Sequence, residues 1–410
     1  MLSKGENHLI KIISIFFFSG SLASLFLQVF LFRLGGFSTV ALFNLIQLAF
    51  LLLLYISSGW LLKKFSTRTL LRVSLLIFSF AWLFLIILGE RSIHHLILLG
   101  IIFGSGQGLF WSSFNLSQYI LTHQKRREAY FGKSSSFSSI ASAFGPIIGG
   151  IIVAKFGLIL GVSYAGYYSL FLIVFVLNAM IFILAQDIPE HKGINFQLAH
   201  IFNHQRSRHW KLVLSQQFIL GLYDAGFSAF SGIILFTIIR QESTLGFVQT
   251  AIGLITAVSS FIAGRMLSRN KKLYVVGAIG AFVGIFLFSY LNNWIGIYFF
   301  IFFTGLCSPY LNIPLSAGIL NGIDTNKEKW QNKYHMLLER DISLGIARIL
   351  SYVILFILFT FWDKSSIALN WMSVISVIPL LLGFLLYLMS RLGDSNPGPA
   401  AYKADALPLS

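Results

Sequence analysis

The chain has 410 residues, of which 56% are hydrophobic and only 11% are charged. A soluble globular domain carries about 25% charged residues, so this composition excludes a water-soluble protein of this length. The apolar residues form long blocks, and about 20 such residues span a hydrocarbon core about 30 Å thick. Because backbone polar groups must be paired inside a bilayer, each block is predicted to be a helix.

The net charge of +16 would suit a nucleic-acid partner, but the basic residues are spread over short loops between the apolar blocks. Nucleic acid is therefore not expected as a partner. Cys307 is the only cysteine, so no disulfide can form within the chain, which suits a plasma or inner membrane protein.

Twelve spans are predicted, at residues 10–32, 39–62, 69–89, 93–121, 135–155, 161–185, 212–239, 245–266, 272–291, 294–320, 341–361 and 366–390. They predict an N-terminal six-helix bundle at 1–185, a cytoplasmic linker at 186–211, a C-terminal six-helix bundle at 212–391 and a disordered tail at 392–410. The linker carries four histidines, but their spacing matches no tight ligand motif, so no metal is expected.

Loops rich in lysine and arginine alternate with loops that contain few of these residues. Of the 30 such residues, 24 fall on the side of both termini, five fall on the opposite side, and Arg348 lies within a span. The positive-inside rule then places both termini in the cytoplasm of a cell membrane. The abundance of Ile, Phe and Lys is typical of an AT-rich bacterial genome.

The two predicted halves carry a similar motif in matching loops. Before the fifth and the eleventh span, a basic residue precedes an acidic one, and a glycine follows four positions later. Duplicated six-helix halves are the usual build of a rocking transporter, with the substrate site between the halves. The candidate gating residues in these loops are Glu128, Gly132, Asp341 and Gly345.

The loop after the second span carries Gly59, Leu61, Lys64 and Arg68 in the spacing Gly-x-Leu-x2-Lys-x3-Arg. In these positions the chain resembles the major facilitator superfamily, whose loop reads Gly-x-Leu-Ala-Asp-Arg-x-Gly-Arg-Lys. The resemblance implies a conformational role for Gly59, Lys64 and Arg68. Lys63 stands where the family has an Asp that latches one state through charge pairing, so the usual latch is not expected.

A second motif lies in the fifth span, where exporters of the family read Gly-x8-Gly-x3-Gly-Pro-x2-Gly-Gly. Small residues let helix backbones approach closely and proline permits a bend, and both properties suit a rocking interface. The resemblance implies export. Ala141 is the one departure, and the chain matches the motif at Gly132, Gly145, Pro146, Gly149 and Gly150.

On the fourth span, polar side chains such as Gln118 share an arc about 80° wide with Gly100 and Gly104. On the seventh span, polar side chains share an arc about 140° wide. The family places these spans around its central cavity. Such groups either line a cavity or hydrogen-bond between helices. Because they cluster on one face of each helix, we expect them to line the cavity. The expected lining residues are Gln28, Asn44, Gln47, Gln107, Trp111, Asn115, Gln216, Gln217, Tyr223, Asp224 and Arg348.

Asp224 lies near the centre of its predicted span, where an ionised carboxylate costs several kcal/mol unless it is paired or hydrated. Proton-coupled exporters of the family carry an arginine where this chain has Ile102. We therefore expect Asp224 to bind and release H+ during a cycle. The alternatives are a fixed salt bridge or binding of a cationic solute. Arg348 is not expected to be the partner, because it lies roughly one helical turn from the level of Asp224.

The sequence thus predicts a secondary active transporter, not an enzyme, that moves a small organic or amphipathic solute by alternating access. Efflux is the expected direction and H+ the coupling ion, in a monomer that sits in the lipid bilayer and needs no cofactor. The chain has no Gly-x4-Gly-Lys-Ser/Thr motif for ATP. Two alternatives remain, a transport-inactive sensor or scaffold of the same fold and a membrane enzyme acting on lipid-linked substrates.

Overall fold

The computed structural model describes residues 3–122, 127–161, 164–194, 196–203, 206–324, 330–362 and 365–394. Within these residues every regular element is a helix, so the prediction of an all-α protein is confirmed. Ten segments are long and apolar enough to cross a membrane. Two of these, Lys4–Lys64 and Thr67–Leu121, each bend back on themselves and supply two crossings, which gives the twelve spans that the sequence predicts.

The N-terminal half consists of α1 (Lys4–Lys64), α2 (Thr67–Leu88), the 3-10 turn η1 (Gly89–His95), α3 (Leu96–Leu121), α4 (Arg127–Leu160) and α5 (Ala165–Leu184). At 1.5 Å per residue, the 61 residues of α1 would measure about 90 Å, three times the hydrocarbon thickness. A break at Gly35 and Gly36 resolves this excess. Gly36 has φ 73°, a left-handed conformation that favours glycine, and a Cβ on Gly35 would lie 2.1 Å from Thr39 Oγ1.

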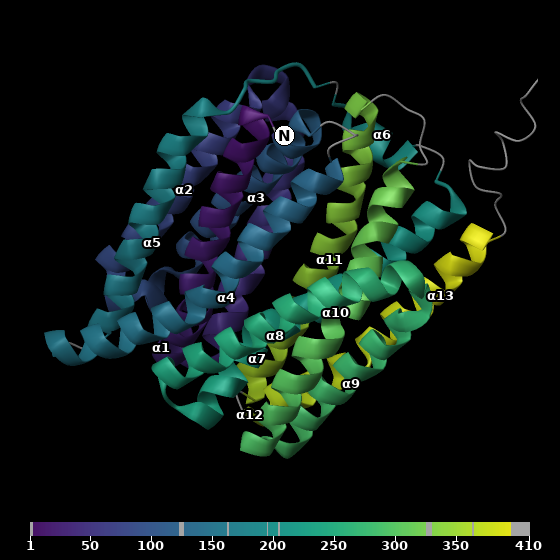
Figure 1. The fold of residues 1–410 in the computed structure, drawn as a ribbon. Coiled ribbons are helices and arrows are strands. Elements are labelled where there is room, and N and C mark those ends of the chain that lie inside the picture. Colours follow the sequence, from purple (N-terminus) through teal and green to yellow (C-terminus); the bar gives the residue numbers. More distant parts are fainter. Residues whose placement is uncertain are drawn as a thin grey trace, which may run out of the picture.

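The segment between the halves contains η3 (Ala185–Asp187) and the short helix α6 (Leu198–Asn203). The C-terminal half consists of α7 (Arg208–Ile239), α8 (Glu242–Arg269), η4 (Lys271–Leu273), α9 (Tyr274–Leu291), α10 (Trp294–Asp324), α11 (Trp330–Trp362), α12 (Ser365–Ile375) and α13 (Ile378–Asp394). Figure 1 shows α1 to α5 on one side of the molecule and α7 to α13 on the other.

Several predicted spans differ from the helices at their ends. Helices α4 and α11 begin at Arg127 and Trp330, well before the predicted starts at 135 and 341. Their first turns carry polar residues, and hydropathy marks only the apolar part of a helix. The predicted span 366–390 is divided between α12 and α13, and Pro379 at the start of α13 removes a backbone donor there.

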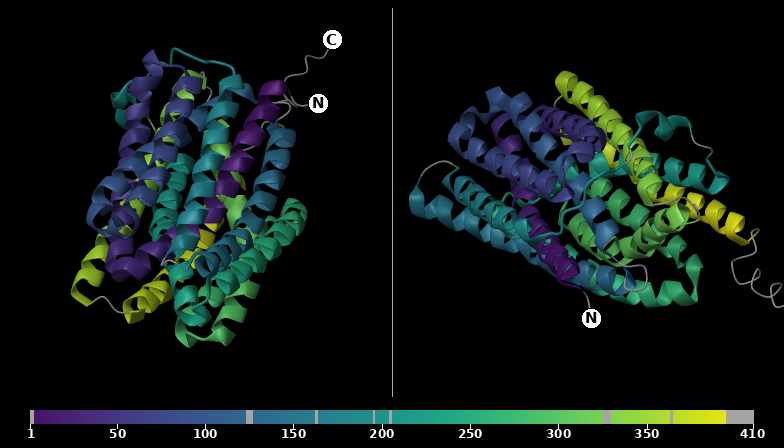
Figure 2. Two further views of the ribbon diagram at one scale, coloured as in Figure 1. Left: turned by 90° about the vertical axis from the view of Figure 1, so that its left-hand side faces the viewer. Right: turned by 90° about the horizontal axis from the view of Figure 1, so that it is seen from above.

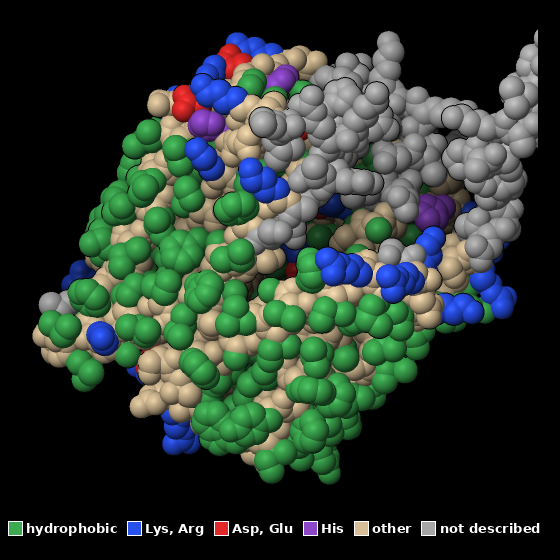
Figure 3. Space-filling model, in the orientation of Figure 1, with side chains coloured by type: hydrophobic (Ala, Val, Ile, Leu, Met, Phe, Trp, Pro, Cys, Tyr) green, Lys and Arg blue, Asp and Glu red, His purple; other side chains and the backbone are tan. Residues whose placement is uncertain are grey.

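The two halves meet along α1 with α11, α4 with α8, and α1 with α7. We call the end of the molecule at which α1 begins and η3 lies the linker end, and the opposite end the far end; Figure 2 shows both halves from two further directions. In the view of Figure 3, apolar side chains cover the broad surface of both halves, and Lys and Arg gather mainly along the upper and right-hand margin.

Candidate functional site

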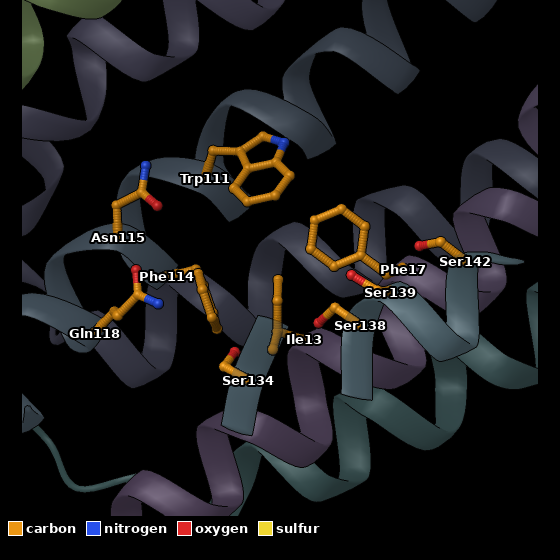
Figure 4. A pocket seen from close by; sticks show the side chains of 10 residues that line it. All are labelled: Ile13, Phe17, Trp111, Phe114, Asn115, Gln118, Ser134, Ser138, Ser139 and Ser142. Atoms are coloured by element: carbon orange, nitrogen blue, oxygen red, sulfur yellow. The ribbon is translucent and has the colours of Figure 1, made fainter. Parts of the chain in front are cut away.

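A cavity of about 370 Å³, which we call the serine cavity, lies among α1, α3 and α4. Figure 4 shows the α3 side chains on one side of it and the α4 serines on the other, with Ile13 and Phe17 of α1 also at its wall. Its lining residues are Ile13, Phe17, Trp111, Phe114, Asn115, Gln118, Ser134, Ser138, Ser139 and Ser142.

A second cavity of about 310 Å³, which we call the inter-half cavity, lies between α1 and α3 of one half and α11 of the other. Trp111 and Asn115 line both cavities, so the two spaces adjoin at these side chains. The inter-half cavity adds charged groups to the site. It is lined by Leu48, Leu51, Leu52, Tyr55, Trp111, Asn115, Arg340, Asp341, Leu344, Gly345 and Arg348.

Arg348 forms an ion pair with Asp224, through Nη2 and Oδ2. The expectation that Arg348 is a poor partner for Asp224 is therefore wrong. One helical turn rises only 5.4 Å, and the long arginine side chain spans that offset. The Asp224 side chain keeps 40% of its surface exposed, so the carboxylate is both paired and accessible. Asp341 pairs with its neighbour Arg340, at 2.6 Å between Oδ1 and Nη2.

Several amides expected at the cavity instead hydrogen-bond to other parts of the protein. Gln28 and Asn44 form a reciprocal pair across the bend of α1, with N–O distances of 3.2 and 2.8 Å. Gln47 Nε2 donates to Gln107 Oε1 between α1 and α3, at 3.0 Å. These four side chains take the interhelical role that the sequence left open.

The expected residues of α7 other than Asp224 also pack within the C-terminal half. Gln216 is fully buried and its Nε2 donates to Leu315 O of α10 at 3.2 Å. Gln217 is only 2% exposed. Tyr223 stacks on Phe227, with ring centroids 4.9 Å apart. Neither these three side chains nor Asp224 is among the lining residues of the two cavities, so the expectation that this face of α7 lines them is wrong.

The glycines of the fifth-span motif lie where α4 meets two other helices. A Cβ on Gly145 or Gly149 would lie within 2.6 Å of an atom of α1, and one on Gly150 would lie 2.5 Å from Glu242 O of α8. Gly246 of α8 in turn packs on Pro146, whose carbonyl oxygen would lie 2.2 Å from an added Cβ. The motif therefore permits close packing both within the N-terminal half and between the halves.

Polar contacts join the two halves at the far end. Arg33 Nη2 of α1 lies 2.6 Å from Glu242 Oε1 of α8, and Tyr167 OH of α5 donates to the same oxygen at 2.9 Å. Nearby, Phe37 of α1 stacks on Phe359 of α11, with centroids 5.1 Å apart. This site was not predicted from the sequence. Its signal was the pair of opposite charges, Arg33 and Glu242, at the far-end tips of spans in different halves.

At the linker end, Arg68 binds the segment between the halves. Its guanidinium donates to Gln186 O at 2.7 Å and pairs with Glu190 Oε1 at 2.6 Å, which holds the pKa of Glu190 below its usual value. Lys63 and Lys64 are exposed. Helix α4 contains Glu128 and Gly132, but the side chain of Glu128 and the surroundings of Gly132 lie outside what the structure describes.

A short part of the linker, which we call the strap (Ile194, Phe196, Gln197 and Ile201), packs between the halves at this end. Phe196 is fully buried, and a Cβ on Gly59 of α1 would lie 2.7 Å from its ring. The ring stacks on His335 of α11, with centroids 5.8 Å apart, and the Gln197 N–H donates to His335 Nε2 at 3.3 Å. Gly59 of the loop motif therefore contacts the linker.

Further contacts tie α11 to its neighbours at the linker end. Ser58 and Tyr334 join α1 to α11 through hydroxyls 3.1 Å apart. Glu339 of α11 pairs with Arg206 and accepts from Trp210 Nε1 at 2.7 Å. Deeper along the same interface, a Cβ on Gly345 would lie 2.9 Å from Leu52 of α1, so Gly345 permits the close approach of α11.

Two six-helix halves with a cavity between them are the architecture of a membrane solute transporter. A sequence model of the Major Facilitator Superfamily matches residues 9–328, and the chain belongs to this family, as its motifs predicted. Among the described residues, no three His, Cys, Asp or Glu side chains gather as a metal site.

Known structures share this fold at low sequence identity. The chain is similar to the nucleoside transporter NupG (TM-score 0.67, 13% identity, 93% of this chain and 98% of that one) and to the human organic anion transporter MFSD10 (0.63, 14%, 94% and 100%). It is also similar to the Escherichia coli fucose:proton symporter FucP (0.60, 16%, 95% and 99%). The major facilitator fold is therefore confirmed.

Two bacterial proteins are similar in sequence. YqgE of Bacillus subtilis (strain 168), described as uncharacterized, is 25% identical over 359 residues, which cover 85% of this chain and 81% of that protein. An uncharacterized Geobacillus stearothermophilus protein encoded in the sodM 3' region is 28% identical over 136 residues, 33% of this chain and 64% of that protein.

Proposed function

We propose that this protein is a secondary active transporter of a bacterial cell membrane that exports a small organic or amphipathic solute by alternating access. The observation that carries the proposal is the inter-half cavity, which takes its lining from α1, α3 and α11. A site shared by both halves changes its exposure when the halves rock against each other. Arg348 lines this cavity, and its guanidinium pairs with Asp224.

Two features support export. The fifth-span motif packs α4 against α8, the interface that must rearrange during rocking. At the far end Arg33 and Tyr167 bind Glu242 of the opposite half, whereas the serine cavity lies along the linker-end parts of α3 and α4. With the linker end in the cytoplasm, as the distribution of Lys and Arg indicates, a solute enters from inside the cell.

We further propose that H+ drives the cycle through Asp224. Its carboxylate pairs with Arg348, which lines the inter-half cavity, and keeps 40% of its side-chain surface exposed, so it is accessible to a proton. Protonation removes the charge that holds Arg348, and the arginine then becomes available to other partners. The ion pair thus gives the cycle two charge states at one site, which is what coupling requires. The bundle boundaries at residues 185 and 212 and the monomeric state belong to the same proposal.

The transport test works on a mixture of solutes. Proteoliposomes are loaded with a deproteinised bacterial extract, placed in an acidic medium, and the released compounds are measured by mass spectrometry. We expect at least one organic compound to leave faster than from liposomes that carry Gly145→Leu protein. Release that equals the protein-free rate for every compound would contradict transport and favour the scaffold alternative. Conversion of a compound without its release would favour the enzyme alternative.

A further inference from the structure

Three serine hydroxyls on the α4 wall of the serine cavity have no partner in the described part of the protein. Serines in membrane helices commonly return their hydroxyl to the preceding turn, as Ser117 of α3 does with Ser113 O at 2.8 Å. Ser138 Oγ is buried without any hydrogen-bond partner. No hydrogen bond joins Ser139 or Ser142 to another described residue.

The opposite wall offers amide oxygens. Asn115 Nδ2 donates to Tyr55 OH and Gln118 Nε2 donates to Tyr130 OH, each at 3.4 Å. These contacts use one donor of each amide, and no described residue donates to Asn115 Oδ1 or Gln118 Oε1. The cavity therefore holds two acceptors on α3 that face three hydroxyls on α4.

The remaining lining is aromatic and apolar. Trp111 lies edge-on to Phe17, with centroids 6.1 Å apart, and Phe114 completes the same wall. Among the ten lining residues none is charged. A cationic amphiphile would find no carboxylate in this cavity, and a purely alkyl solute would leave the hydroxyls and amide oxygens unsatisfied.

We propose that the serine cavity binds an uncharged, hydroxyl-rich ring solute, namely a sugar in free or glycoside form. The ring hydroxyls donate to Asn115 Oδ1 and Gln118 Oε1 and exchange hydrogen bonds with the α4 serines. The apolar C–H face of the ring packs on Trp111. This inference rests on the proposed function and names the substrate class for the cavity that adjoins the inter-half cavity at Trp111 and Asn115.

The test measures binding directly and does not depend on flux. Native Cys307 is replaced by Ala, Ser142→Cys is introduced at the cavity wall, and its reaction with a water-soluble maleimide is followed in the purified full chain. The probes are methyl glycosides of the common hexoses and pentoses, each at up to about 10 mM, ten times the upper end of usual KM values. We expect at least one glycoside to slow the labelling.

Matched variants locate the binding. Asn115→Leu, and Ser138→Ala with Ser139→Ala, should each weaken protection by that glycoside, by about 2- to 12-fold for every hydrogen bond lost. Ser117→Ala is the control, because its hydroxyl is already bonded to α3. Alanine has a higher helix propensity than serine, so the serine-to-alanine variants are expected to retain the fold.

The inference is overturned if no glycoside protects Ser142→Cys, or if protection is equal in the wild-type background and in the two wall variants. Failure of the inference is distinguishable from failure of the proposed function. Proteoliposomes that release only charged or hydroxyl-free compounds would overturn the sugar assignment and leave transport standing. Glycoside protection without any release would retain the sugar site and contradict transport.

Discussion

The backbone N–H of Ile147 in α4 donates to Thr250 Oγ1 in α8 at 3.1 Å, across the interface between the two halves. The donor directly follows Pro146, whose carbonyl oxygen packs on Gly246 of α8. One turn of α4 thus combines a proline, a hydrogen bond and a close backbone contact with the opposite half. The α4–α8 interface is therefore specific in register as well as apolar.

Gly246→Val should block transport while the protein still inserts and folds. An added Cβ would lie 2.2 Å from Pro146 O, and forcing bulk into such packing costs about 1–3 kcal/mol. Gly264→Val on the same helix is the matched control, because nothing lies within 4 Å of its added Cβ. Flux is measured in proteoliposomes at equal protein content. Equal flux in the two variants would remove the case for a moving α4–α8 interface.

Glu242→Gln should open the far end more often. The Arg33–Glu242 pair is partly exposed and contributes about 1 kcal/mol, so its loss changes the population of the open state about fivefold. The measurement is maleimide labelling of Ile234→Cys, a far-end position that is 1% exposed, in a Cys307→Ala background. The charge-reversed pair Arg33→Glu with Glu242→Arg should return labelling to the original rate. If the single and double variants label alike, the pair is not a gate.

Asp224→Asn should abolish flux driven by a pH gradient and preserve exchange of solute at equal pH. The amide cannot take up a proton, but it keeps the shape of the site. Asp187→Asn at the linker end serves as a control for the loss of one acidic residue. Unchanged gradient-driven flux in Asp224→Asn would falsify the coupling role, and loss of both activities would instead favour a structural salt bridge.

Phe196→Ala should loosen the strap. A fully buried phenylalanine contributes about 3–5 kcal/mol through packing, and here its partners are Gly59 and His335. We expect trypsin to cut after the exposed Lys192 at least ten times faster than in the wild type, as mass spectrometry of the peptides would report. Leu198→Ala is the control, because Leu198 is already 36% exposed. Cleavage at the wild-type rate would mean that the strap is held by other contacts.

Reporters fused after Lys272 and after Arg391 should both lie in the cytoplasm, and a reporter at Asn292 should lie outside. The reason is the excess of Lys and Arg in the loops at the linker end. A phosphatase active only outside the cytoplasm and a fluorescent protein active only inside provide opposite readouts. Fusions at 272 and 391 on different faces would contradict the span count.

The spans and the family could be predicted from the sequence because both depend on local signals, namely apolar runs and glycine spacing. The sequence could not predict which residues of a polar face line a cavity and which pack on a neighbouring helix. Gly100, Gly104 and Trp111 share one arc of α3, but Gly104 packs on Gln47 O of α1, whereas Trp111 lines both cavities. Helices cross at an angle, so one face meets a neighbouring helix in one part and a cavity in another.

The contacts of the linker were also beyond the reach of the sequence. Phe196 lies in a polar segment without periodicity, so only the fold shows that it fills the space beside Gly59. The pairing of Arg348 with Asp224 depends on the relative tilt of α7 and α11, which spacing along each helix does not determine. The fold thus followed from hydropathy, and the site required the packing of helices distant in sequence.

The binding place of the strap is assembled from residues made at very different times. Gln197 and His335, which hydrogen-bond, are 138 residues apart, and translation proceeds at about 5–20 residues per second. His335, the stacking partner of Phe196, is therefore synthesised roughly 7–28 s after Phe196. During biogenesis the linker must remain undocked while the second bundle inserts. Its docking is a late step of maturation, because it requires α11 to be in place.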